Sequence, residues 1–408
     1  FMQYYIMYFE RTISKVVLDT SETFPVVLIT GPRQIGKSTV FERLKEDNRT
    51  YVTLDDPQIR MLAQTDPALF LQIYKPPVLI DEVQYAPELF PYIKMMVDKR
   101  KEKGLFWLTG SQPFQLMEKV SESLAGRVGI LELQGLSQAE KNQTSVEPFL
   151  PDTVTSSNRE PYTINSFYSL ILKGSFPELY ATPRLNKNTF YASYLKTYIE
   201  RDIRNLTNVQ DERLFLTFLK VTAARTGQLL NYADIAKDVG ITLNTVKSWI
   251  SLLLTSGLVF LLQPYHNNLT NRAVKTPKLH FMDTGLCAYL CGWTTAETLS
   301  VGAMSGAIFE SYVVSEIIKS YLHHNEQGQF YFYRDKDRQE IDLIIERDNI
   351  FYPIEIKRTA SPQLNDVKTF ELLKRNGLTV GKGAIVCLYE NLLPLNKKVW
   401  IIPVGCLG

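Results

Sequence analysis

Residues 31–39 of this chain are Gly31-Pro32-Arg33-Gln34-Ile35-Gly36-Lys37-Ser38-Thr39. The spacing of the two glycines and the lysine follows the pattern G-x-x-x-x-G-K-S, which is typical of a phosphate-binding loop. The apolar residues 25–29 before it predict a buried parallel strand, and residues 38–44 predict the first turns of a helix. Because the pattern lies between a strand and a helix, we interpret it as a nucleotide site rather than a glycine turn with a chance lysine.

The nine residues of this loop are expected to contact the phosphates of ATP. Gly31 and Gly36 let the backbone approach a phosphate without a Cβ atom in the way. The N–H groups of the loop and of the following helix present partial positive charge to the phosphates. Lys37 would reach the β- and γ-phosphates, and the hydroxyl of Ser38 would bind Mg²⁺. The sequence therefore predicts ATP and Mg²⁺ as cofactors.

Two acidic residues follow a second buried strand. Residues 77–80 are continuously apolar, as expected of a strand that is buried on both faces, and Asp81 and Glu82 come directly after them. Ligands of such sheets bind beyond the carboxyl ends of the strands. We therefore expect Asp81 to hold Mg²⁺ through water and Glu82 to polarise the water that attacks ATP.

Two further polar residues are candidates for the same site. Ser111 follows the apolar residues 105–108 and would lie between the acidic strand and the γ-phosphate; the alternative is an ordinary turn. Arg127 follows a helical stretch and precedes the apolar strand predicted over 128–133. It would stabilise phosphate charge in its own site or in that of a neighbouring copy; the alternative is a surface arginine.

Length and composition indicate a globular protein with several domains. A chain of 408 residues with 45% hydrophobic and 22% charged residues is too long for one ordinary core and predicts two to four domains. The net charge of +2 excludes a general attraction to nucleic acid or membrane. The four cysteines are too few for a disulfide framework, and no apolar run reaches the roughly 18 residues of a spanning helix. We therefore expect a cytoplasmic protein with no membrane partner.

The rest of the chain divides by composition and periodicity. The pattern predicts a linker over 141–165, a helical lid over 166–211, a winged helix-turn-helix over 212–265, and a connector with a mixed α/β domain over 266–408. The exposed face of the winged helix would carry Asn244, Lys247 and Ser248, which suits a DNA groove. Basic residues are few there, and phosphate contacts dominate DNA affinity, so a packing or protein-contact role is equally open.

The C-terminal domain carries a second group of candidate site residues. Residues two apart on a strand share a face, so Glu340 would lie beside Asp342 and Glu355 beside Lys357. Asp342 and Glu355 would hold Mg²⁺, and Lys357 would orient or activate water for phosphodiester cleavage. Glu310, on the preceding helix, would complete the metal site. The alternatives are a hairpin with a polar outer face and a salt bridge between Lys357 and the acids without a metal.

Taken together, these motifs resemble those of AAA-type ATPases. The runs that carry the resemblance are GPRQIGKST, VLIDEVQ, WLTGSQ, SLAGRV, GSFPELY, YLKTYIERDI, FMDTGL and the C-terminal EID and EIK. The chain is similar to prokaryotic ATP-binding proteins whose C-terminal domain of unassigned function has a restriction-endonuclease-like core with the pattern ID…ExK. The resemblance implies an AAA-type domain over 10–140, and it makes Arg127 and Arg201 candidates for phosphate-sensing or finger roles.

The predicted fold class is therefore α/β, with a P-loop parallel sheet, a helical lid, a winged helix-turn-helix and a C-terminal restriction-endonuclease-like domain. Three functions fit it. The first is an Mg²⁺-dependent ATPase that moves the lid against the other two modules. The second is a DNA-acting enzyme in which ATP gates cutting, and the third is an ATP-switched DNA-binding regulator without nuclease activity. The expected partners are ATP and, as open alternatives, DNA, a protein partner or a second copy of the chain.

Overall fold

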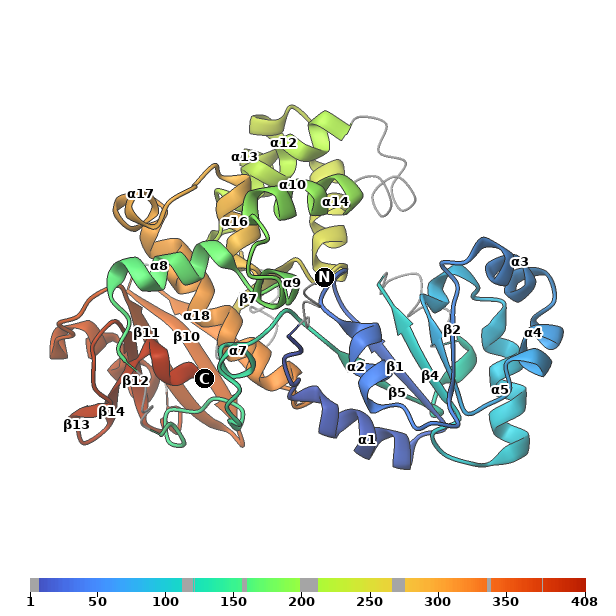
Figure 1. The fold of residues 1–408 in the computed structure, drawn as a ribbon. Coiled ribbons are helices and arrows are strands. Elements are labelled where there is room, and N and C mark those ends of the chain that lie inside the picture. Colours follow the sequence, from blue (N-terminus) through green and yellow to red (C-terminus); the bar gives the residue numbers. More distant parts are fainter. Residues whose placement is uncertain are drawn as a thin grey trace.

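The computed structural model describes residues 7–111, 120, 122–155, 160–198, 212–265, 276–335, 339–375 and 377–408. Figure 1 shows two sheets on opposite sides of the molecule, with a layer of helices at one end. Arg201, one of the predicted phosphate contacts, lies outside the described residues.

The N-terminal sheet is parallel throughout. Its strands are β1 (Val26–Thr30), β2 (Thr50–Thr53), β3 (Val78–Asp81), β4 (Phe106–Gly110) and β5 (Val128–Glu132). They pair in the order β2-β3-β4-β1-β5, and every pair is parallel. Strands that run the same way bring their carboxyl ends to one edge of the sheet. This confirms the predicted P-loop parallel sheet, and it places the ends of β1 and β3 at the same edge.

Helices cover both faces of this sheet. They are α1 (Ile13–Thr23), α2 (Lys37–Leu44), α3 (Pro57–Thr65), α4 (Pro67–Ile73), the short 3-10 helix η1 (Val83–Tyr85) and α5 (Leu89–Arg100). Val27 of β1 packs in the core cluster of α1 and α2, whereas its neighbour Val26 packs in the cluster of α3, α4 and α5. Because successive residues of a strand face opposite sides, burial on both faces explains why β1 is continuously apolar.

A group of helices follows the first sheet in the chain. They are α7 (Gln138–Asn142), α8 (Ile164–Lys173), α9 (Glu178–Ala181), α10 (Lys187–Tyr198), α12 (Glu212–Ala223), α13 (Tyr232–Val239) and α14 (Leu243–Thr255). Gly240 ends α13 in the left-handed conformation, with φ of 78°. Thr242 then caps α14 by accepting a hydrogen bond from the backbone of Thr245. The chain therefore reverses between α13 and α14 at Gly240.

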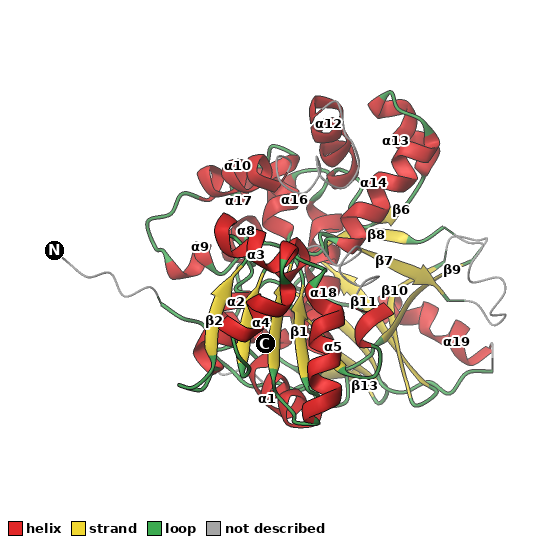
Figure 2. Ribbon diagram, turned by 90° about the vertical axis from the view of Figure 1, so that its right-hand side faces the viewer, coloured by secondary structure: helices red, strands yellow, loops and turns green. Residues whose placement is uncertain are grey.

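The C-terminal sheet has nine strands. They are β6 (Gln228–Leu229), β7 (Val259–Pro264), β8 (Lys278–Phe281), β9 (Gln329–Arg334), β10 (Glu340–Arg347), β11 (Ile350–Lys357), β12 (Gly383–Cys387), β13 (Leu393–Asn396) and β14 (Val399–Pro403). Their order is β13-β14-β12-β11-β10-β9-β7-β8-β6. Figure 2 shows β6, β7, β8 and β9 side by side below α13 and α14. The strands that follow α14 therefore belong to the same sheet as the C-terminal domain, and the predicted boundary at residue 265 falls inside that sheet.

The long helix α18 (Ser305–Leu322) occupies the centre of the molecule. The remaining helices are α16 (Thr284–Leu290), α17 (Ala296–Val301), α18 (Ser305–Leu322), η3 (Leu364–Phe370), α19 (Glu371–Arg375) and η4 (Val404–Leu407). α18 is buried along most of its length. Within the described ranges, no helix combines the length and the apolar character that crossing a membrane requires.

Candidate functional site

The phosphate loop leaves β1 in a conformation that requires glycine. Gly31 has φ of 138°, and a Cβ atom there would lie 2.0 Å from the carbonyl oxygen of Leu133. Gly36, with φ of 89°, is the N-terminal cap of α2. Any other residue would be strained at either position, and at Gly31 it would also clash with the backbone. The two glycines of the motif therefore set the path of the loop from β1 to the amino end of α2.

Lys37 lies inside this loop. Its side chain is buried, and its Nζ atom donates to the carbonyl oxygens of Gly31 at 3.0 Å and Pro32 at 2.7 Å. A buried ammonium requires such partners, because desolvation of an unpaired charge is costly. The loop thus holds a cation at the position where the motif predicts the β- and γ-phosphates.

The other residues of the loop have different surroundings. Arg33, Gln34 and Thr39 line an open cleft beside the loop. The side chain of Ile35 is buried in the core. Pro32 lies against the turn between α14 and β7, where a Cβ atom on Gly257 would be 3.1 Å from the proline ring. The loop that is predicted to bind phosphate therefore also contacts the helical region.

Ser38 and Asp81 lie next to each other at the carboxyl edge of the sheet. The Ser38 hydroxyl donates to Oδ1 of Asp81 at 2.5 Å, and the Tyr51 hydroxyl donates to Oδ2 at 3.2 Å. The Thr109 hydroxyl also contacts Oδ1. Mg²⁺ prefers oxygen ligands and takes few of them from the protein, keeping waters and substrate phosphates for the rest. The pair of Ser38 and Asp81, with their oxygens already together, fits such an ion.

Glu82 is held in an uncommon conformation. It has φ of 57° and ψ of 45°, a left-handed conformation that few residues other than glycine adopt. Thr109 accepts its backbone N–H at 3.0 Å, and Ser111 donates to its Oε2 at 3.1 Å. The amide of Gln84 contacts the same Oε2. Ser111 therefore lies beside Glu82, and the strained backbone turns the carboxylate toward these two donors.

The cleft beside the loop has a volume of about 780 Å³, which is a usual size for a ligand site. One wall comes from the loop, the start of α2 and Glu82. The opposite wall comes from residues of the segment 177–197, including Glu178, Phe190 and Ser193. The segment predicted as a lid thus forms one side of the candidate nucleotide site.

Three residues of this site were not among the predicted ones. Tyr51, Gln84 and Thr109 contact the two acids, but the sequence analysis selected Ser111 alone from the run after β4. Thr109 lies near the carboxyl end of β4, which neighbours β3 in a parallel sheet, so the same strand-end rule that selected Asp81 could have found it. Tyr51 and Gln84 carry no such signal, because their contacts depend on side-chain direction.

Arg127 lies at the opposite edge of the sheet from the loop, so the predicted contact with phosphate in its own chain is wrong. It precedes β5, whose first residue Val128 pairs with Val26, the first residue of β1. The loop begins only after the last residue of β1, about 16 Å further on at roughly 3.3 Å per residue. Arg127 instead forms an ion pair with Asp98, with Nε and Oδ1 2.6 Å apart.

The structure brings the predicted acids of the C-terminal domain together. The antiparallel register that pairs Leu343 with Ile354 places Asp342 opposite Glu355. Oδ2 of Asp342 accepts the backbone N–H of Ile356 at 2.8 Å. Burial raises the pKa of Asp342. Burial, together with the nearby charge of Asp342, raises the pKa of Glu355 to about 8. The Asp342 charge therefore disfavours ionisation of Glu355 across the hairpin.

Two lysines accompany these acids. Nζ of Lys357 lies 2.7 Å from Oε1 of Glu355. Lys278 on β8 was not among the predicted residues. Its Nζ lies 2.8 Å from Oε1 of Glu310, contacts Glu340 and lies 3.9 Å from Oδ1 of Asp342. Burial disfavours a charged Lys278, but the three carboxylates outweigh it and raise the pKa of this lysine. Across the described part of the chain, no three His, Cys, Asp or Glu side chains are placed to hold a metal ion.

A buried network connects the phosphate loop with α18. Arg11 of the N-terminal segment donates to the carbonyl oxygens of Ile35 at 2.8 Å and Gln134 at 2.7 Å. Its Nε lies 3.1 Å from Oε1 of Glu140, and Nδ1 of His323 lies 3.2 Å from the same oxygen. Burial opposes ionisation of Glu140, but Arg11 and His323 hold its pKa well below its usual range. One carboxylate therefore joins the loop to the end of α18.

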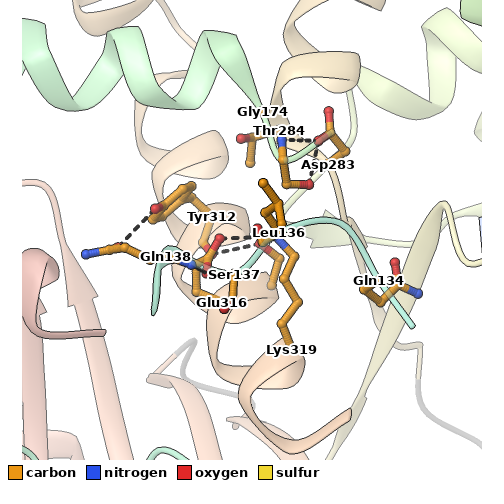
Figure 3. Close-up of polar contacts among 12 residues, drawn as sticks. Gln134, Leu136, Ser137, Gln138, Gly174, Asp283, Thr284, Tyr312, Glu316 and Lys319 are labelled. Carbon is orange, nitrogen blue, oxygen red and sulfur yellow. Dashed lines mark hydrogen bonds and ion pairs between the residues drawn. The ribbon is translucent and has the colours of Figure 1, made fainter. Parts of the chain in front are cut away.

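The segment before Glu140 makes further contacts with α18 (Figure 3). The backbone N–H of Gln138 donates to Oε2 of Glu316 at 2.6 Å, and Tyr312 donates to the side chain of Gln138 at 3.0 Å. Lys319 pairs with Glu316 at 3.1 Å. Each contact joins residues more than 170 positions apart in the chain, apart from the pair within α18. These contacts fix the first domain to the C-terminal one.

Asp283 connects two of the runs that carried the sequence resemblance. Its Oδ2 accepts the backbone N–H of Ser175 at 2.6 Å and the Ser175 hydroxyl at 2.7 Å. Its Oδ1 accepts from Leu286 at 2.6 Å, where it caps α16, and from the Tyr191 hydroxyl at 3.0 Å. Gly174 and Asp283 lie together in Figure 3. Asp283 therefore joins the run GSFPELY to the run FMDTGL at the base of the predicted lid.

Family models match three separate parts of the chain. Residues 23–142 match the model described as an AAA domain. Residues 164–297 and 305–407 match models that are described as domains of unknown function, DUF8612 and DUF4143. The parallel sheet with its phosphate loop is therefore an AAA-type domain, which supports ATP binding and hydrolysis in general.

Two mycobacterial proteins are similar over most of the chain. An uncharacterized protein of Mycobacterium tuberculosis is 29% identical over 382 residues, which are 93% of this chain and 80% of the relative. An uncharacterized protein of Mycobacterium bovis gives the same values. Among solved structures, the Walker-type ATPase of Pyrococcus abyssi is 14% identical with a TM-score of 0.43, covering 69% of this chain and 96% of that one. AMPPCP-bound DnaA from Aquifex aeolicus is 12% identical with a TM-score of 0.26, covering 59% and 85%.

Proposed function

We propose that this protein is an Mg²⁺-dependent ATPase in which hydrolysis drives or gates the helical region and the C-terminal domain. One observation carries the proposal: Lys37, Ser38, Asp81 and Glu82 converge at the carboxyl edge of the parallel sheet, beside a cleft of nucleotide size. Lys37 supplies a cation, Ser38 and Asp81 supply oxygen ligands, and Glu82 supplies a carboxylate. Phosphoryl transfer to water requires these groups.

Each residue has a separate task in this proposal. Ser38 and Asp81 would hold Mg²⁺, which when bound neutralises charge on the β- and γ-phosphates. Lys37 would exchange the carbonyls of Gly31 and Pro32 for phosphate oxygens, because an anion is the stronger partner for an ammonium. Glu82 would accept a proton from the attacking water, while Ser111 keeps its carboxylate in place.

The walls of the cleft support the gating part of the proposal. The segment 177–197 faces the phosphate loop across the cleft, so a bound nucleotide would contact both. Asp283 ties the base of this segment to α16, and Pro32 of the loop lies against the turn after α14. A change at the phosphates would therefore be passed to the helical region by direct contact. Arg127, half-buried at the far edge of the sheet, would reach a phosphate only in a second copy of the chain.

The experiment that tests the proposal is measurement of phosphate release from ATP by the purified chain. We expect release in the presence of Mg²⁺ and its loss after removal of the metal with EDTA, with recovery when Mg²⁺ is restored. Release at the same rate in EDTA would contradict the assignment of Ser38 and Asp81, and an absence of release with Mg²⁺ would contradict the ATPase itself.

A second candidate function is DNA binding by α14, which the exposure of Asn244, Lys247 and Ser248 on this helix favours. The test is titration of duplex DNA at several salt concentrations. If Lys247 contacts phosphate, Lys247→Glu is expected to weaken binding to all sequences and to lower the salt slope by about 1. Lys15→Glu, an exposed lysine on α1, is the control. Equal affinities for the two variants and the parent would contradict this role of α14.

A further inference from the structure

Four carboxylates of the C-terminal domain form a cluster, and three of them lie around one buried lysine. They come from three elements, namely Glu310 of α18, Glu340 and Asp342 of β10, and Glu355 of β11. Lys278 belongs to β8, which is separated from β10 in the sheet by β7 and β9. Its side chain crosses that distance beside the ring of Phe332 on β9, with Nζ 5.4 Å from the ring centroid. It is 3% exposed, so its ammonium has been taken almost fully out of water.

The ammonium of Lys278 lies among the carboxylates that were predicted to bind a metal ion. Nζ of Lys278 is 2.8 Å from Glu310 and 3.9 Å from Asp342, and it contacts Glu340. A divalent ion that bound Glu310 and Asp342 would have its oxygen ligands within about 2.0–2.6 Å. It would therefore share two carboxylates with an ammonium in a buried site, where like charges repel strongly. In this arrangement, the residues do not fit the predicted metal.

The chain also supplies a cationic partner for each of the four carboxylates. Lys278 faces three of them, and Lys357 pairs with Glu355 at 2.7 Å. Arg334 adds a second partner for Glu340 at 3.5 Å. Buried charges are tolerated in proteins when they are paired or when they coordinate metals. Here each of the four carboxylates has a cationic partner from the chain itself, so the residues supply their own cations.

We propose that Lys278 takes the place of the divalent cation that the ID…ExK pattern predicts, so that this cluster is a lysine-filled site which fixes β8 to β10 and α18. The C-terminal domain then has no metal-dependent nuclease activity. Its carboxylates instead hold the strands that follow α14 against the rest of the C-terminal sheet. This inference concerns a site separate from the phosphate loop, so it stands or falls independently of the proposed ATPase.

The test compares binding of Mn²⁺ to full-length variants in the absence of nucleotide. Lys278→Met removes the ammonium and keeps the length of the side chain, while Lys278→Arg keeps the charge. We expect Lys278→Met to bind one more Mn²⁺ per chain than the parent and Lys278→Arg, by calorimetric titration. Adding Asp342→Asn to Lys278→Met is expected to remove this extra ion. Any binding at the phosphate loop is common to all the variants and cancels in the comparison.

Two further measurements keep the test decisive if Lys278→Met is unstable. Its unfolding temperature is expected to rise with Mn²⁺ far more than that of the parent, because a ligand that binds only the folded state stabilises it. The parent and Asp342→Asn are expected to give the same Mn²⁺ titration and no nicking of plasmid DNA. Mn²⁺ binding or nicking by the parent that Asp342→Asn abolishes would overturn the proposal. Failure of folded Lys278→Met to gain an ion would overturn it as well.

Discussion

Lys37→Ala is expected to weaken ATP binding by at least about 100-fold. The structure places its ammonium inside the phosphate loop, on the carbonyls of Gly31 and Pro32. Hydrogen bonds to charged groups contribute about 1.5–3 kcal/mol each, and tenfold in affinity is about 1.4 kcal/mol. Loss of contacts with two phosphates therefore accounts for a change of this size. Equilibrium titration with ATP and Mg²⁺ measures it.

Lys99→Ala is the matched control for this variant. Lys99 is exposed in the last turn of α5, away from the cleft, so its removal takes away the same charge without touching the loop. We expect this variant to bind ATP like the parent. If Lys37→Ala kept the affinity of the parent, residues 31–39 would not be a nucleotide site. Circular dichroism melts of both variants separate loss of binding from loss of folding.

Glu82→Gln is expected to bind ATP and to hydrolyse it about 10²–10⁴-fold more slowly, the range that positioned general bases contribute. The amide has the shape of the carboxylate and keeps one oxygen for Ser111 and Gln84. It cannot take a proton from water. Single-turnover phosphate release measures the chemical step, and titration of ATP under the same conditions shows that binding is retained.

Glu178→Gln is the control within the same cleft. Glu178 lies on the opposite wall, where its Oε1 accepts a hydrogen bond from Thr182. We expect near-parental turnover from this variant. The opposite pattern, with slow hydrolysis in Glu178→Gln and parental hydrolysis in Glu82→Gln, would place the base in the lid. Glu82 would then serve only to hold the left-handed turn after β3.

The parts of the fold that could be predicted from the sequence depend on short-range patterns. The buried strands of the first sheet are continuously apolar because both faces are covered, and the loop motif is local to nine residues. The turn at Gly240 and the cap at Thr242 are also local. Asp342 and Glu355 could be brought together from the hairpin alone, because its strands are neighbours in sequence.

The misplaced arginine shows a rule that the sequence analysis did not apply. A residue that precedes a parallel strand lies at the amino edge of the sheet, and ligands bind at the carboxyl edge. Arg127 precedes β5, so its own topology already excluded a contact with the loop of the same chain. The parallel arrangement of the strands excludes a contact between Arg127 and this loop, and that arrangement was predicted from the sequence.

Other features depend on partners that are distant in the chain. Lys278 meets Glu310 and Asp342 only because β7 pairs with β9, and no local pattern selects that pairing. The contact between Glu140 and His323 spans 183 positions. A buried lysine on a strand resembles any polar residue of an exposed face until the sheet that covers it is known. For this reason, the acids of this cluster could be selected from the sequence, whereas the lysine beside them could not.

The shared carboxylate of Glu140 has a thermodynamic consequence for the whole protein. Arg11 holds the carbonyl of Ile35 in the phosphate loop, and through Glu140 it is linked with His323 at the end of α18. If a bound nucleotide displaces the loop, this network passes the displacement on to α18. Such coupling is reciprocal, because two ligands that affect one another's binding do so by the same factor. Whatever binds the C-terminal domain and shifts α18 must therefore change the affinity for ATP to the same degree.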